Sequence, residues 1–111
     1  MDLSYTDIES LGNLTSIGGY LDLRGVKIET LGNLTSVGGD LDLDGCHNLT
    51  SLGNLTSVEG NLELEHCKNL TSFGNLTSVG WSLYLRYTPF SKKYSKKEIR
   101  QMIEVGGDIY L

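Results

Sequence analysis

The chain has 111 residues, of which 39% are hydrophobic and 21% are charged. This length suits one domain with a modest core and leaves little room for a second functional domain. No apolar run approaches the roughly 20 residues that a membrane span needs, and the acidic start lacks a signal-peptide pattern. We therefore expect a cytoplasmic protein, in the producing or host cell, without a membrane partner.

The formal net charge of −5 is unevenly distributed along the chain. Residues 1–90 contain eleven acidic and four basic side chains, whereas residues 91–111 contain three acidic and five basic ones. Because contacts to phosphates require cations, the acidic part argues against nucleic-acid binding through residues 1–90. We expect instead a protein partner with a basic surface.

Four near-copies of one phrase recur along the chain at steps of 20, 21 and 21 residues. The first copy is Leu-Gly-Asn-Leu-Thr-Ser-Ile at 11–17, and close variants stand at 31–37, 52–58 and 73–79. A repeat this short cannot enclose a core of its own, so its copies must stack and share one apolar column. The period therefore predicts a solenoid whose functional residues lie on its surface.

A second motif of the form Leu-x-Leu-x-x-(Cys/Val)-x-(x)-Leu lies between these phrases. It occupies residues 21–28, 41–49 and 62–70, and weaker copies stand at 1–8 and 83–90. The two motifs together resemble the leucine-rich repeat over nearly the whole chain. The glycine-rich consensus and the lysine-rich carboxyl end also look like those of small leucine-rich repeat proteins from bacteria and their phages.

The two halves of each repeat predict different backbone structures. In Leu-x-Leu both leucines point inward and the residue between them points outward, as in a strand. The other phrase spaces its apolar residues three apart, which suits an irregular or 3₁₀-like arc. The resemblance implies a right-handed coil, with a parallel sheet of about six short strands on the concave face and the arcs on the convex face.

Residues 1–90 are therefore expected to form the repeat coils, and residues 91–111 a capping coil at the carboxyl end. The capping coil is predicted to contain one short α-helix at about 95–104 and a final strand at 109–111. Ser95 and Glu98 fit the Ser-x-x-Glu capping box at the start of this helix, and Gly106 is placed to end it. One face of the helix is apolar, with Ile99, Met102 and Ile103.

The outward residues of the predicted sheet stack into columns, because neighbouring strands lie about 4.8 Å apart. The central column is Asp2, Asp22, Asp42, Glu63, Tyr84 and Tyr110. Aromatic residues rim this face and are predicted to cluster towards the carboxyl end: Tyr20, Trp81, Tyr84, Tyr87 and Tyr110. The residues that we expect to bind a partner are Tyr20, Asp22, Arg24, Asp40, Asp42, Asp44, Glu63, Glu65, Tyr84, Arg86 and Tyr110.

Two interpretations of the acidic column remain open. Like charges on neighbouring strands cost stability, so the carboxylates are either held for a partner that neutralises them or copied with their coil by repeat duplication. The first interpretation predicts a non-enzymatic protein-interaction module. Two alternatives are a phage-encoded inhibitor that imitates nucleic acid before a host defence enzyme, and a self-assembling structural repeat protein that dimerises through its exposed end coils.

The sequence gives no signal for an enzyme, a cofactor or a metal. No nucleophile stands beside a recognisable base, and the acidic residues show no differentiated acid and base. Cys46 and Cys67 occupy the same inward repeat position, so they are expected to be buried free thiols. His47 adjoins Cys46 and His66 adjoins Cys67, but both histidines should point outward, which argues against a shared zinc site.

Overall fold

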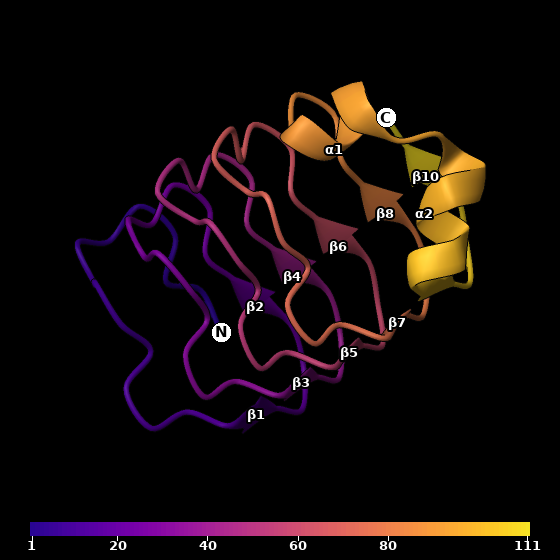
Figure 1. Ribbon diagram of the computed structural model, residues 1–111. Helices are drawn as coiled ribbons and strands as arrows, with labels where there is room; N and C mark the ends of the chain where they lie inside the picture. The colour runs from indigo at the N-terminus through magenta and orange to yellow at the C-terminus, as the bar shows by residue number, and fades with distance from the viewer.

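The computed structural model describes all 111 residues as a solenoid built on two parallel sheets (Figure 1). The first sheet contains β2 (Leu21–Asp22), β4 (Leu41–Asp42), β6 (Leu62–Glu63), β8 (Leu83–Tyr84) and β10 (Ile109–Tyr110). The second sheet contains β1 (Ser16–Ile17), β3 (Ser36–Val37), β5 (Ser57–Val58), β7 (Ser78–Val79) and β9 (Glu104–Val105). Each coil from β2 to β9 contributes one strand to each sheet, so the predicted solenoid is confirmed.

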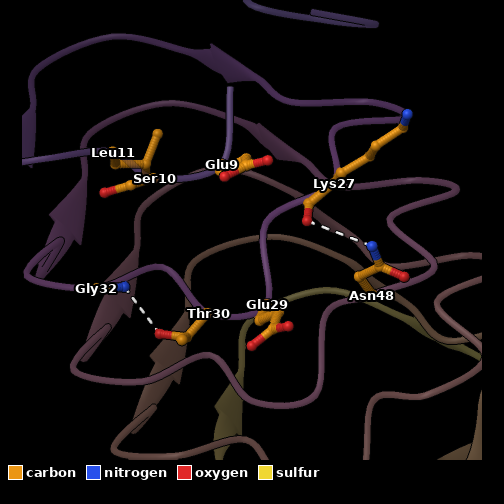
Figure 2. Close-up of a pocket in the computed structure, with 8 residues that line it drawn as sticks. All are labelled: Glu9, Ser10, Leu11, Lys27, Glu29, Thr30, Gly32 and Asn48. Carbon is orange, nitrogen blue, oxygen red and sulfur yellow. Dashed lines mark hydrogen bonds between the residues drawn. The ribbon is translucent and has the colours of Figure 1, made fainter. Parts of the chain in front are cut away.

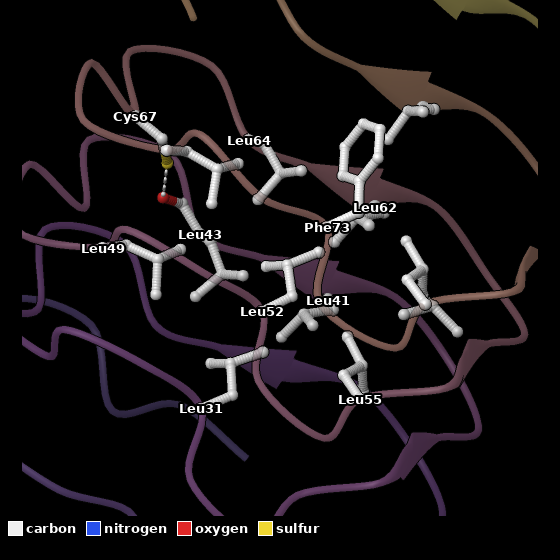
Figure 3. Close-up of a cluster of buried hydrophobic side chains, with 14 of the residues drawn as sticks. Leu31, Leu41, Leu43, Leu49, Leu52, Leu55, Leu62, Leu64, Cys67 and Phe73 are labelled. Atoms are coloured by element: carbon white, nitrogen blue, oxygen red, sulfur yellow. Dashed lines mark hydrogen bonds between the residues drawn. The ribbon is translucent and has the colours of Figure 1, made fainter. Parts of the chain in front are cut away.

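One continuous core fills the space between the sheets (Figure 3). Both leucines of the Leu-x-Leu motif are fully buried, as at Leu62 and Leu64, because alternate residues of a strand face the same side. The strand leucines stack in register, with Leu62 between Leu41 and Leu83. The repeated leucines therefore form the single apolar column that the period predicts.

The arc that the sequence predicts as irregular contains the second sheet. Ser36 pairs with Ser57, and Val37 pairs with Val58, in parallel register. The threonine just before β3, β5 and β7 adds a bond between coils, as where the Thr56 hydroxyl donates to the carbonyl O of Thr35 at 2.9 Å. The arcs thus stack as closely as the strands, which a spacing of three between apolar residues does not reveal.

The first sheet has five strands, and the predicted sixth is reduced to a single bridge. Asp2 pairs with Asp22 in parallel orientation at the position where the sequence predicts the first strand. Leu3 N–H donates to the carbonyl O of Asp22 at 2.9 Å, which continues the ladder. The first coil therefore joins the sheet in the expected register but over a shorter length.

Two helices replace the single helix predicted at 95–104. The first, α1 (Pro89–Lys93), has proline in its first turn, where the missing N–H costs nothing. The second, α2 (Lys96–Met102), follows after extended backbone at Tyr94. The predicted capping box is confirmed, because Ser95 Oγ accepts from Glu98 N–H and Glu98 Oε1 accepts from Ser95 N–H.

The end of α2 also differs from the prediction. Ile103 has extended backbone, which leads directly into β9, and Gly106 lies beyond that strand. Ile99 and Ile103 are buried, whereas Met102 is 44% exposed. Pairing of β9 with β7 therefore stops the helix four residues before Gly106. Neither helix has the length and apolar character that crossing a membrane requires.

Candidate functional site: the acidic face

The structure places the predicted central column in one continuous register. Asp22 pairs with Asp42, Asp42 with Glu63, and Glu63 with Tyr84. Tyr84 in turn pairs with Tyr110 at the carboxyl end of the sheet. We call the outward carboxylates of this sheet the acidic face: Asp22, Asp42, Asp44, Glu63 and Glu65.

Two arginines of the chain already neutralise part of the acidic face. Arg24 Nη2 lies 2.8 Å from Asp22 Oδ2, and Arg24 Nε lies 3.0 Å from Asp22 Oδ1, so the pair is bidentate. Arg24 Nε also lies 3.6 Å from Asp42 Oδ2. Arg86 Nη1 lies 3.6 Å from Glu65 Oε2, an oxygen that is buried and accepts no hydrogen bond. Both arginines, predicted as partner contacts, therefore also bind within the chain.

Several aspartates have a structural role that the sequence does not reveal. Asp42 Oδ1 accepts from Asp44 N–H at 3.0 Å, within the same turn. Asp44 Oδ1 accepts from Glu65 N–H at 2.9 Å, and Asp40 Oδ1 accepts from Asn61 N–H at 2.8 Å, both across to the next coil. These carboxylates therefore stabilise the turns of the coils, so part of the acidic pattern has a structural role.

Glu63 differs from these aspartates. No backbone amide donates to its carboxyl group, and no lysine or arginine lies within ion-pair distance. Asp44 also lacks a cationic partner, and oxygens of Asp42, Asp44 and Glu63 lie within 4.8 Å of one another. The middle of the acidic face is therefore a crowded carboxyl cluster, in which Asp42 alone has a cation, Arg24, within ion-pair distance.

The crowding changes the protonation of these groups. Burial, followed by repulsion from Asp42, raises the pKa of Glu63 to about 7. Burial is also the main cause that raises the pKa of Asp44 to about 6, and it raises the pKa of Asp42. Part of the face is consequently protonated near neutral pH, and a cation brought to it would favour ionisation.

The raised pKa of Glu63 gives the first prediction, which concerns stability. The folded state binds more protons than the unfolded state between the ordinary pKa of 4.5 and about 7, so stability falls as pH rises through this window. Glu63→Gln should raise the free energy of unfolding at about pH 8 by up to about 1 kcal/mol, since solvent screens a partly exposed group. Urea unfolding at both ends of the window measures this.

The variant should also change how steeply the free energy of unfolding depends on pH, and not only its value at pH 8. Glu63→Gln is expected to flatten the pH dependence, whereas Glu29→Gln, at an exposed position outside the acidic face, should leave it as in the wild type. A wild-type stability that rises from about pH 5 to about pH 8 would contradict the prediction.

The aromatic residues do not all cluster as predicted. Tyr84 and Tyr110 stack with ring centroids 4.6 Å apart, and the Arg86 guanidinium lies 5.3 Å from the Tyr110 ring. Tyr20 precedes β2 at the opposite edge of the sheet, so its placement at the carboxyl end is wrong. Trp81 is 66% exposed and does not pack under the capping coil.

The carboxyl cluster is also the one group of side chains that could jointly ligate a metal. Asp42, Asp44 and Glu63 offer three carboxylates, whereas Ca²⁺ takes about six to eight oxygen ligands. The pKa of Asp44 is raised to about 6 and that of Glu63 to about 7. A metal ion would have to displace protons from these groups near neutral pH, which weakens its binding. We therefore assign no metal to the cluster.

One hollow of the molecule lies away from the acidic face, on the arcs of the first coils (Figure 2). It has a volume of about 540 Å³ and a mixed lining that includes Glu9, Lys27 and Glu29, with Leu11 as its one apolar residue. Binding pockets for small molecules are usually lined mainly by apolar side chains. This hollow lacks that character and contains none of the predicted site residues.

The cysteines are buried free thiols, as predicted. Cys46 Sγ donates to the carbonyl O of Leu23, and Cys67 Sγ donates to the carbonyl O of Leu43, both at 3.1 Å. Burial raises the pKa of Cys46 to about 11 and that of Cys67 to about 12. The thiols therefore stay protonated and serve packing, because the thiolate is the reactive form.

The fold and the acidic face together define a class: a short-repeat solenoid of parallel strands with turns of about 21 residues. No family model, curated protein or solved structure matches the chain.

Proposed function

We propose that this chain is a non-enzymatic protein-interaction module that binds a partner with a basic surface through the acidic face. The observation that carries the proposal is the carboxyl cluster of Asp42, Asp44 and Glu63, in which Asp44 and Glu63 have no cationic partner within the chain. Like charges on neighbouring strands destabilise a sheet, and the Glu63 carboxyl group accepts no backbone amide, unlike the carboxylates of Asp42 and Asp44. A cationic partner would offset the repulsion and favour ionisation of the cluster.

The aromatic end of the sheet extends the proposed surface. The stacked pair Tyr84 and Tyr110 continues the column of Glu63, so anionic and aromatic groups lie side by side. Tyrosine and arginine are enriched in interface cores, where they combine apolar area with hydrogen bonding. We also propose that the coils are a short variant of the leucine-rich repeat, which the buried Leu-x-Leu motifs of the four central coils support.

The test measures binding of a lysine- and arginine-rich peptide by fluorescence anisotropy at low and high salt. Glu63→Lys is expected to weaken binding by about tenfold or more at low salt, because it reverses one charge in the middle of the cluster. Glu63 is a better site for the change than Asp42, whose carboxylate holds a backbone amide of its own turn.

Glu29→Lys supplies the matched control. It changes the net charge by the same amount at an exposed position outside the acidic face, so it should leave most of the binding intact. Equal weakening by both variants would show that net charge alone attracts the peptide and would refute binding through the acidic face. A wild-type protein that does not bind the basic peptide at low salt would refute the proposed partner class.

A further inference from the structure

Arg100 on α2 directs its guanidinium at the backbone of the last coil. Nη1 donates to the carbonyl O of Val105 at 2.9 Å, and Nη2 donates to the carbonyl O of Gly107 at 2.8 Å. No carboxylate forms an ion pair with this side chain. Arg100 therefore hydrogen-bonds the backbone at the last edge of the solenoid and does not neutralise a carboxylate.

In every earlier coil, the equivalent two carbonyl groups accept backbone amides of the next coil. The N–H to carbonyl O pairs are Gly38 to Ile17 at 2.8 Å, Gly39 to Gly19 at 3.1 Å, Glu59 to Val37 at 2.9 Å, Gly60 to Gly39 at 3.0 Å, Gly80 to Val58 at 2.8 Å, Trp81 to Gly60 at 3.2 Å, Gly106 to Val79 at 2.9 Å and Gly107 to Trp81 at 2.8 Å. Arg100 occupies the next two positions of this series. Its guanidinium thus replaces the amides of a coil that would follow.

The first coil shows the complementary half of this pattern. Gly18 and Gly19 hold the repeat positions of Gly106 and Gly107, but their N–H groups donate to no acceptor. Both residues are exposed. If the first coil of a second copy stacked on the last coil, these amides would meet the carbonyl groups of Val105 and Gly107 in the register of the repeat. Arg100 competes directly for these two acceptors.

Charge and apolar surface would both favour such a contact. The first coil has three exposed acidic residues, Asp2, Asp7 and Glu9, and five exposed basic residues lie on and beside the two helices, namely Lys92, Lys93, Lys96, Lys97 and Arg100. Five apolar side chains of the first coil are only partly buried: Leu3, Ile8, Leu11, Leu14 and Ile17. Opposite charges at the two ends attract one another, and head-to-tail contacts that do not close a ring generate open filaments.

We propose that Arg100 is an edge plug that prevents head-to-tail assembly of copies of this chain. It satisfies the two carbonyl groups that would otherwise accept a second copy's first coil. Exposed strand edges are a recognised hazard, and proteins blunt them with charged side chains or by covering them. The proposal is independent of the acidic face, because it concerns the two ends of the solenoid and not its outward strand residues.

Arg100→Ala tests the proposal by sedimentation over micromolar to millimolar protein concentrations. The wild type should keep its monomer mass of 12.2 kDa, whereas the variant should increase in mean mass with concentration towards dimers and longer chains. We expect α2 to stay folded, since Ile99 remains buried and the capping box does not involve Arg100. Circular dichroism at each concentration checks this.

Two variants separate the plug from other effects. Lys97→Ala removes the same charge from α2 without removing a hydrogen bond, and it should remain monomeric. Gly18→Pro, added to Arg100→Ala, removes one of the two free donors, and its preceding residue Ile17 has the extended backbone that proline favours. The double variant should return to the monomer mass.

The proposal is overturned if folded Arg100→Ala remains a monomer at millimolar concentration, or if the wild type or Lys97→Ala assembles to the same extent. If Arg100→Ala does not fold, Arg100→Gln takes its place, because its single amide can donate to one carbonyl group and still fill the space. Assembly of Arg100→Gln with rising concentration then supports the edge plug, and a folded monomer refutes it.

Discussion

Leu62→Ala is expected to lower the free energy of unfolding by about 3 to 5 kcal/mol, a large part of the stability of a domain of this size. Leu62 is fully buried on β6 and pairs in register with Leu41 and Leu83. Removing three carbon atoms there loses the transfer energy of the side chain and leaves a cavity. The leucines on either side belong to backbone fixed by the ladder and cannot easily collapse into it. Urea unfolding followed by circular dichroism measures the change.

Leu3→Ala is the matched control for this prediction. Leu3 is the repeat equivalent of Leu64, the other fully buried leucine of the same Leu-x-Leu motif, but it lies in the first coil and is only partly buried. We expect a loss of about 1 kcal/mol, because less apolar surface leaves the water and the end coil can relax. Equal losses at both positions would show that coils contribute alike whatever their neighbours, which would contradict nearest-neighbour stabilisation of the solenoid.

The central column shows how far the sequence alone could predict the site. A Leu-x-Leu motif fixes which residue of each coil points outward, and the repeat length fixes which residues become neighbours. Asp22, Asp42 and Glu63 therefore fall in register as predicted. The pairing of Arg24 with Asp22 is also predictable from the sequence, because residues two apart on a strand share a face.

The remaining features depend on backbone paths that no periodic pattern encodes. The aspartate bonds to neighbouring coils, such as Asp44 to Glu65 N–H, depend on turn geometry between the strands. Arg100 looks in sequence like one more exposed cation of a basic helix. Its role becomes visible only when Val105 and Gly107 are seen to end the ladder beside it. The second sheet was missed for a similar reason, since Ser-Val is too short to show strand alternation.

Gly74→Ala should destabilise the fold by about 2 to 5 kcal/mol, through two effects that a second variant can separate. Gly74 has a φ of +58°, and a Cβ built there would lie 2.4 Å from the carbonyl O of Gly53 in the preceding coil. Left-handed backbone costs a residue with a Cβ about 1 to 2 kcal/mol, and overpacking adds about 1 to 3 kcal/mol. That carbonyl O also accepts from Asn75 N–H at 3.1 Å, so moving it disturbs a bond between coils.

Gly12→Ala isolates the backbone term. Gly12 has nearly the same φ, +60°, but no atom lies within 4 Å of a Cβ built on it, because no coil of this chain stacks on that side. Its expected loss is therefore about 1 to 2 kcal/mol, and the difference between the two variants measures the stacking contact alone. If the two variants lose equal free energy of unfolding in urea, close stacking of the coils is not what excludes a Cβ at this repeat position. The glycine of the Leu-Gly-Asn-Leu-Thr-Ser phrase would then be needed for its left-handed backbone only.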